Sequence, residues 1–171
     1  MQVVILSGSP RDEEWVDKIV AVLDRLGVPA VRRVGSAHRV PEHVLDLLRR
    51  YDAEPEPTVF IAVAGMSDAL SGLSDANVAS PVISCPPRSE AFAGLDVLSS
   101  LRTPPGVAPV VSLEPANAAL AAAKILGLVD PDLRKRVSAY QAEAAARVLD
   151  ADTALLGGGS SIDDLLPGAA P

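Results

Sequence analysis

The tetrapeptide Ser36-Ala37-His38-Arg39 gathers a hydroxyl, an imidazole and a guanidinium within four positions. An unperturbed imidazole titrates at about pH 6.5, so such a side chain both accepts and donates protons under physiological conditions. A guanidinium binds phosphate or carboxylate through paired donors. The alternative is that His38 is an ordinary surface residue of a loop, and the tetrapeptide alone does not decide between the two.

A second polar segment, "SGSPRD" (7–12), offers the elements of a phosphate site. Ser7 and Gly8 end an apolar run, Ser9 supplies a hydroxyl and Arg11 a cation, and the backbone N–H groups precede a helical pattern. Helix N-termini and turns of this kind bind phosphate through their N–H groups. The competing interpretation is that Gly8 and Ser9 simply form a turn.

A third segment, "AGMSDALSG" (64–72), combines small residues with Ser67 and Asp68. Glycine at position 65 lets a planar ligand approach the backbone, while Ser67 and Asp68 offer polar contacts. The same letters also suit a capped helix start, with Ser67 or Asp68 as the N-cap. Local pattern does not choose between these two interpretations.

A fourth segment, "CPPRSE" (85–90), begins with the only cysteine of the chain. Cys85 ends an apolar run, which favours an inert core thiol over a nucleophile. Pro86 and Pro87 fix the shape of the loop, and the sequence does not tell whether either is cis. His43, one turn into a helical pattern, is expected to be solvated.

The length, net charge and cysteine count of the chain exclude several classes of protein. At 171 residues the chain fits one domain. The net charge of -7 repels polyanions, so nucleic acid is not an expected partner. One cysteine excludes an intramolecular disulfide and a cysteine-rich metal site, which favours the cytoplasm. The first apolar run is too short for a signal peptide, and no run is long enough to cross a membrane.

Five short apolar runs alternate with helical patterns, at 3–6, 28–34, 58–64, 81–85 and 108–113. This alternation predicts an α/β fold, a parallel five-stranded sheet with helices on both faces. The clearest helical pattern covers 12–26, with Asp12 as the expected N-cap. Pro41 and Pro115 are expected to open two more helices, the latter closed by Gly127.

Ligands of such sheets bind at the carboxyl ends of the strands. The four polar segments follow four predicted strands, so they are expected to converge in space. This placement favours a functional role for His38 over that of a loop residue.

A long C-terminal helix is expected from Asp130 to Leu149. Its apolar stripe is expected to pack on another subunit, the alternative being its own sheet; the stripe comprises Leu133, Val137, Tyr140, Ala144 and Val148. Residues 151–171 contain a Gly-Gly-Gly-Ser-Ser run and are expected to be a flexible tail behind a domain of residues 1–150.

Taken together, the motifs resemble the phosphoribosylaminoimidazole carboxylase (PurE) family over residues 2 to 150. They are "GS-x-x-D", "SAHR", "PTVFIAVAG-x-S-x-x-L", "PVISCPP", "DVLSSLRTPPGVAPVVSLEP" and "AA-x-ILGL". The block from Pro81 to Pro115 is most similar to the class II branch, which uses CO2 directly. The class I mutase branch carries a histidine before Leu-Pro-Gly in its glycine-rich loop, and this histidine is missing in 64–72.

The resemblance implies a three-layer αβα sandwich of flavodoxin-like topology, assembled as an octamer or tetramer. It implies carboxylation of 5-aminoimidazole ribonucleotide (AIR) at C4 by CO2, with no metal and no cofactor. His38 would be the catalytic residue that moves the C4 proton. The implied substrate-binding residues are Ser7, Gly8, Ser9, Arg11, Asp12, Ser36, Ala37, Arg39, Ala64, Gly65, Met66, Ser67 and Asp68.

Three positions depart from the family pattern: Arg11, Met66 and Asp68. Arg11 replaces a serine of the first loop, and Met66-Ser67-Asp68 replaces Arg-Ser-Asn. An acid beside a carboxylate product is unfavourable unless Asp68 points away or is protonated. The alternatives that stay open are a mutase acting on the N5-carboxyamino isomer, a family member with changed substrate or lost activity, and a flavin-binding reductase suggested by "LSGSPR".

Overall fold

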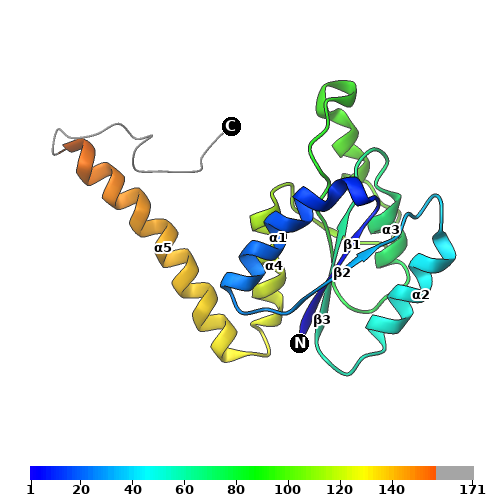
Figure 1. Cartoon of the computed structure of the whole chain (residues 1–171), viewed down its shortest axis with the longest axis horizontal. Helices are drawn as coiled ribbons and strands as arrows, with labels where there is room; N and C mark the ends of the chain where they lie inside the picture. The colour runs from blue at the N-terminus through cyan, green and yellow to red at the C-terminus, as the bar shows by residue number, and fades with distance from the viewer. Residues whose placement is uncertain (157–171) are drawn as a thin grey trace.

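Residues 1–156 are described here by a computed structural model of the chain. They contain a five-stranded sheet in which all strands are parallel, in the order β2-β1-β3-β4-β5 (Figure 1). The strands are β1 (Gln2–Ser7), β2 (Ala30–Val34), β3 (Thr58–Val63), β4 (Val82–Ser84) and β5 (Val110–Val111). The predicted five-stranded parallel sheet is therefore confirmed, and its last two strands are shorter than their apolar runs.

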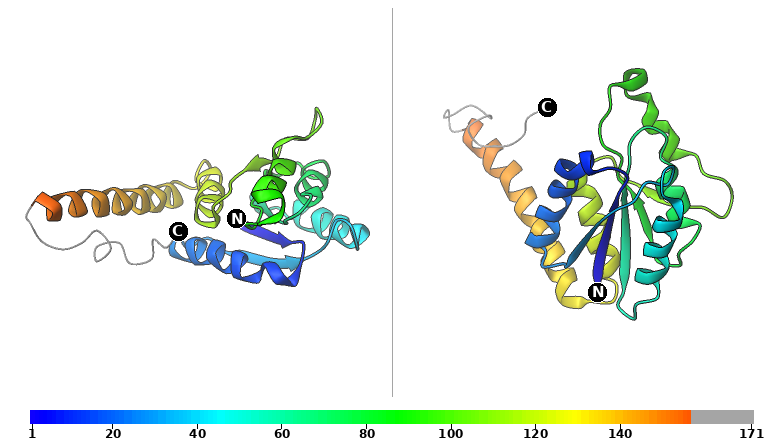
Figure 2. Two further views of the ribbon diagram at one scale, coloured as in Figure 1. Left: turned by 90° about the horizontal axis from the view of Figure 1, so that it is seen from above. Right: turned by 45° about the vertical axis from the view of Figure 1, so that its right-hand side comes forward.

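Helices cover both faces of the sheet, as the three-layer prediction requires (Figures 1 and 2). Helices α1 (Glu13–Arg25) and α4 (Pro115–Leu126) pack on one face, and α2 (Pro41–Asp52) and α3 (Ala69–Asp75) on the other. Successive side chains of a strand point to opposite faces. In β1, Val3 and Ile5 accordingly join the core under α1 and α4, while Val4 and Leu6 join the core under α2.

The helix starts follow local chemistry in two cases. Pro41 and Pro115 are the first residues of α2 and α4, where a missing N–H costs nothing, and Gly127 is the C-cap of α4. In α1, Val16, Ile19, Val22 and Leu23 are buried, which is the face expected from the pattern.

The N-cap of α1 is Asp12, as predicted, but its side chain makes no capping hydrogen bond. A short 3-10 turn, η1 (Pro10–Asp12), precedes the helix. Ser9 caps that turn, because its Oγ accepts a hydrogen bond from Arg11 N at 3.2 Å. The proline at position 10 suits the first position of a helical turn, and the capping side chain thus lies three residues upstream of Asp12.

One element had no counterpart in the predicted pattern. Segment η2 (Ala91–Leu101) consists of 3-10 turns interrupted by three residues of left-handed backbone, Phe92, Ala93 and Gly94, with φ of 51°, 55° and 83°. Left-handed backbone at two non-glycine residues costs roughly 1–2 kcal/mol each, so sequence patterns do not anticipate it.

The C-terminal helix α5 (Pro131–Leu156) corrects two expectations. Leu133 and Val137 are buried in the core of their own domain and Tyr140 packs against it, so this part of the stripe faces the same chain. The C-terminal part of the helix extends away from the body (Figures 1 and 2), and Val148 is 65% exposed. The tail expected from residue 151 is helical through Leu156, and its remainder lies outside the described residues.

Candidate functional site

A cavity of about 660 Å³ opens where the chain leaves the carboxyl ends of β1, β2 and β3. The strand order reverses direction at β1, and such switch points are where parallel sheets form ligand sites. A volume of this size suits a small organic ligand. The cavity is lined by Gly8, Ser9, Pro10, Arg11, Asp12, Ser36, Ala37, His38, Arg39, Ala64, Gly65, Met66, Ser67 and Leu70.

Three of the four polar segments therefore meet at this cavity, whereas the fourth, 85–90, was expected there and does not line it. The structure brings 12 of the 14 candidate residues to this cavity, and leaves Ser7 and Asp68 outside it. Ser7 is buried at the end of β1, and its hydroxyl donates to the carbonyl oxygen of Arg33 at 3.3 Å. Its role is to join two strand ends, so a direct substrate contact by this side chain does not fit its position.

The first loop is shaped by a close approach of two strands. Gly8 N–H donates to Val63 O at 2.8 Å, and a β-carbon on Gly8 would lie 3.3 Å from that of Ala64. Beyond it, Ser9 and η1 turn the backbone toward the cavity. Burial raises the pKa of Asp12, and a hydrogen bond to its carboxylate from the backbone of Ser9 opposes this effect.

The second loop carries His38 on a tight turn. Arg39 N–H and Val40 N–H both donate to Ser36 O, at 3.2 and 2.9 Å. Gly35 is required before this turn, because a β-carbon there would lie 2.9 Å from Cγ2 of Val44 in α2. The turn leaves the side chains of His38 and Arg39 exposed at the mouth of the cavity.

His38 reaches across the cavity to the third loop. Its Nε2 lies 3.3 Å from Ser67 Oγ. Either the serine donates to the unprotonated nitrogen or the protonated nitrogen donates to the serine, so the pair persists while the ring gains and loses a proton. An imidazole held in this way can transfer a proton to or from a ligand in the cavity.

Two cations border the same cavity. Within residues 1–156, no ion pair involves Arg11 or Arg39, whereas other arginines are paired with acids. Their guanidinium groups thus keep their donors for a ligand. Together with Ser9 and Ser36 they suit an anionic group such as phosphate.

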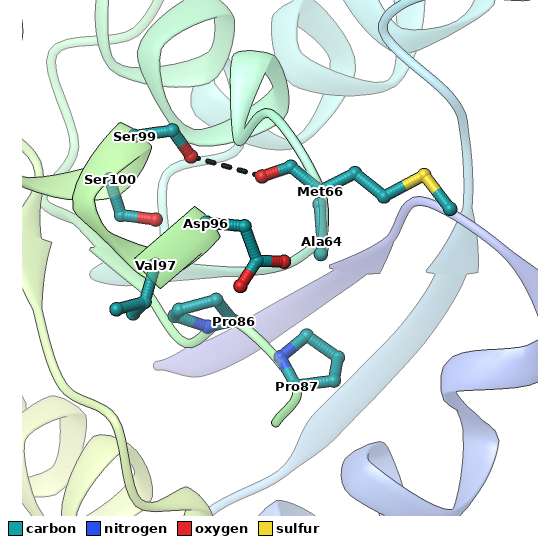
Figure 3. A pocket seen from close by; sticks show the side chains of 9 residues that line it. Ala64, Met66, Pro86, Pro87, Asp96, Val97, Ser99 and Ser100 are labelled. Carbon is teal, nitrogen blue, oxygen red and sulfur yellow. Dashed lines mark hydrogen bonds between the residues drawn. The ribbon is translucent and has the colours of Figure 1, made fainter. Parts of the chain in front are cut away.

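The third loop has a strained residue at its centre. Met66 has φ of 65°, and its carbonyl oxygen accepts a hydrogen bond from Ser99 Oγ at 3.1 Å. Figure 3 shows this bond beside a narrow second cavity of about 10 Å³ between the loop, Pro86 and Asp96. Gly65 faces open space, with no atom within 4 Å of a β-carbon built on it. The loop therefore exposes its backbone to the main cavity.

Asp68 does not face the cavity. Its side chain is 7% exposed, and its carboxylate accepts hydrogen bonds from Ser71, Ser84 and Ser100. It is also the N-cap of α3, which is the helix-start interpretation of this segment. The expected substrate contact by this side chain is thus corrected: the carboxylate points away from the cavity, and the anticipated repulsion of a carboxylate product is avoided.

Sequence reasoning missed several residues around the site. Pro10 and Leu70 line the cavity, and both lie within the polar segments 7–12 and 64–72 without having been singled out there. Ser99 holds the third loop from η2, 33 residues away in sequence. The only signal in the sequence is that it forms a pair of adjacent serines with Ser100.

The remaining candidates behave as structural residues. Cys85 is fully buried, and burial raises the pKa of its thiol to about 12, so it is not a thiolate nucleophile at neutral pH. Pro86 and Pro87 both follow trans peptide bonds. His43 lies on the exposed surface of α2. In residues 1–156 there is no cluster of His, Cys, Asp or Glu suited to a metal ion, and no helix long and apolar enough to span a bilayer.

Comparison with known proteins gives a consistent family. The sequence model described as AIR carboxylase matches residues 2–147. The phosphoribosylaminoimidazole carboxylase of Archaeoglobus fulgidus is 46% identical over 91% of this chain and 85% of its own length. A bifunctional phosphoribosylaminoimidazole carboxylase/succinocarboxamide synthetase of Rattus norvegicus is 42% identical over 74% of this chain and 30% of its own length. The crystal structure of Treponema denticola PurE has a TM-score of 0.88 at 42% identity, covering 90% of this chain and 98% of that one.

Proposed function

Since the chain belongs to the AIR carboxylase family, we propose that it carboxylates 5-aminoimidazole ribonucleotide at C4 with CO2 in purine biosynthesis. One observation carries this proposal: His38 Nε2 lies 3.3 Å from Ser67 Oγ, at a cavity also lined by Arg11 and Arg39, neither of which forms an ion pair within residues 1–156. A proton-transfer group and an anion-binding surface thus face the same space. This is the pair of features that a phosphorylated, proton-releasing substrate requires.

The reaction follows from the chemistry of the ring. The amino group of the substrate donates electron density into the imidazole, so C4 attacks the carbon of CO2. The new bond leaves C4 with both a hydrogen and a carboxylate. Loss of that proton restores aromaticity, and the unprotonated Nε2 of His38 is the base that takes it.

The other residues act by binding. Arg11, Arg39, Ser9 and Ser36 hold the phosphate and ribose through charge-assisted hydrogen bonds. The backbone at Gly65 and the hydroxyl of Ser67 stabilise charge as the carboxylate forms. Binding of the phosphate needs no metal ion, because Arg11 and Arg39 supply the positive charge.

We further propose that the active form is a homo-oligomer, an octamer or a tetramer, working in the cytoplasm. The outer part of α5 supports the oligomer, since Val148, Leu149 and Leu156 are 65%, 66% and 83% exposed. Apolar side chains on a projecting helix favour burial against another copy. Light scattering on the purified chain tests this: a monomer at micromolar concentration would contradict it.

The activity is tested by two substrates in parallel. Purified protein is mixed with AIR and bicarbonate-derived CO2, or with the N5-carboxyamino isomer, and the 4-carboxy product is followed by ultraviolet absorbance. We expect product from AIR with CO2. Product from the carboxyamino isomer alone would assign a mutase instead, and no product from either substrate would overturn both assignments.

A further inference from the structure

The carboxylate of Asp68 is buried and accepts hydrogen bonds from other residues of the protein. Its Oδ1 accepts Ser71 N–H at 3.1 Å, and its Oδ2 accepts the hydroxyls of Ser71 at 2.7 Å, Ser100 at 2.8 Å and Ser84. The three serines are at most 3% exposed. Within residues 1–156 no lysine or arginine pairs with it. We call these four residues the Asp68 cluster.

The cluster joins three elements that are distant in sequence. Ser71 belongs to the first turn of α3, Ser84 ends β4, and Ser100 lies near the end of η2. A buried ionised carboxylate is costly unless all its acceptor sites are filled. Four donors aimed at one side chain therefore fix where Asp68, and the backbone before it, can lie.

Ser99, which precedes Ser100, holds the same loop through two further hydrogen bonds. Its Oγ accepts Asp68 N–H at 3.1 Å and donates to Met66 O at 3.1 Å. Ser67 lies between these two attached residues and, like Met66, is exposed. These two hydrogen bonds, at Met66 O and Asp68 N–H, hold Met66 in its left-handed conformation.

We propose that Asp68 is a positioning residue: its hydrogen-bonded cluster holds Ser67 Oγ within reach of His38 Nε2. The inference rests on the proposed function, in which that pair handles the C4 proton and the forming carboxylate. In this role Asp68 acts on the loop from the side away from the cavity and makes no contact with the substrate.

Removing the acceptor atoms of the cluster tests this role. Asp68→Ala takes both carboxylate oxygens away from the N–H of Ser71 and from the three serine hydroxyls. This variant should therefore shift the loop, and Ser84→Ala and Ser100→Ala should loosen it less.

The test compares these variants in the full chain with Ser74→Ala as the matched control. Ser74 is 1% exposed, lies on the same helix α3, and its hydroxyl has no hydrogen-bond partner among the described residues. The chain has only two histidines, so the imidazole nitrogen signals of His38 and His43 are resolved by NMR. This readout does not depend on turnover.

We expect the three cluster variants to shift the His38 signals and leave those of His43 unchanged, while Ser74→Ala changes neither. For AIR carboxylation, kcat/KM should fall about tenfold in Asp68→Ala and about threefold in Ser84→Ala, as for small misplacements of a site. In a Ser67→Ala background the Ser84→Ala effect should vanish, because the positioned group is gone.

Folded cluster variants with the wild-type His38 spectrum would overturn the proposal, and so would additive losses in the Ser67→Ala background. If Asp68→Ala does not fold, Ser84→Ala and Ser100→Ala carry the test. If the wild-type chain gives no carboxylation of AIR, the proposed function fails, and the imidazole spectra alone decide on the positioning role.

Discussion

The turn of residues 35–39 and the loop of residues 64–68 face each other across one cavity, but they are held in place differently. The turn is closed by backbone hydrogen bonds to Ser36 O and leaves His38 exposed. The loop is fastened from behind by Asp68 and Ser99. His38, the proton-transfer group, thus lies on a turn held by backbone hydrogen bonds. Ser67, which orients it, is held in place by buried side-chain contacts. Changes to the exposed side chains of the turn should alter binding or chemistry without loss of stability, and changes to the buried contacts of the loop should alter chemistry and stability together.

His38→Asn gives the largest expected effect. Removing a general base lowers kcat/KM for carboxylation about 10³-fold, while the unfolding midpoint stays unchanged because the side chain is exposed. Steady-state kinetics and thermal unfolding measure both. His43→Asn is the matched control and should retain wild-type turnover. Full activity in His38→Asn would break the assignment of the turn to chemistry.

Arg39→Gln is expected to weaken substrate binding and spare the chemical step. Losing a charge-assisted contact to phosphate raises KM about 30-fold with kcat changed less than about twofold. Arg49→Gln is the control, since its exposed ion pair with Asp46 contributes little. A loss confined to kcat would instead place Arg39 among the groups that act in the transition state.

Gly35→Ala tests how tightly the turn packs on α2. The added methyl group would lie 2.9 Å from Val44 Cγ2 and 3.4 Å from Leu6 Cδ1, so the free energy of unfolding should fall by about 1–2 kcal/mol. Urea unfolding measures this. Gly72→Ala, where no atom lies within 4 Å, should be neutral or stabilising. Equal effects at both glycines would contradict the packing argument.

Asp52→Ala tests a carboxylate remote from the cavity, one that serves stability alone. Asp52 accepts the N–H groups of Ala79 and Ser80, both at 3.1 Å. Burial raises the pKa of Asp52, but its hydrogen bonds from Ser80 and Ala79 outweigh burial and lower it overall. The variant should lose about 1 kcal/mol at neutral pH, as for a lost cap.

The pH dependence of that loss has a fixed sign. Because the folded pKa of Asp52 lies below the unfolded one, its stabilisation is present above about pH 4 and disappears as pH falls through the folded value. Urea unfolding of wild type and Asp52→Ala at pH 7 and pH 3 should therefore converge in acid. A difference that grows in acid would contradict the account.

Much of the site could be predicted because its parts are local. Strand runs, prolines at helix starts and polar segments after strands are each written in neighbouring residues, and parallel topology then brings Ser9, His38 and Ser67 together. The direction of Asp68 could not be predicted, since it depends on Ser84 and Ser100, which lie 16 and 32 residues away. The left-handed turn in η2 and the split role of α5 likewise depend on tertiary packing, which no periodicity records.

The most direct test of the central claim uses the reverse reaction in D2O. Decarboxylation of the 4-carboxy product must place a hydrogen on C4, and by microscopic reversibility the protonated His38 supplies it. NMR of the product should show enzyme-dependent deuterium at C4 with the wild-type chain and about 10³-fold slower incorporation with His38→Asn. Incorporation at the wild-type rate in His38→Asn would contradict the account.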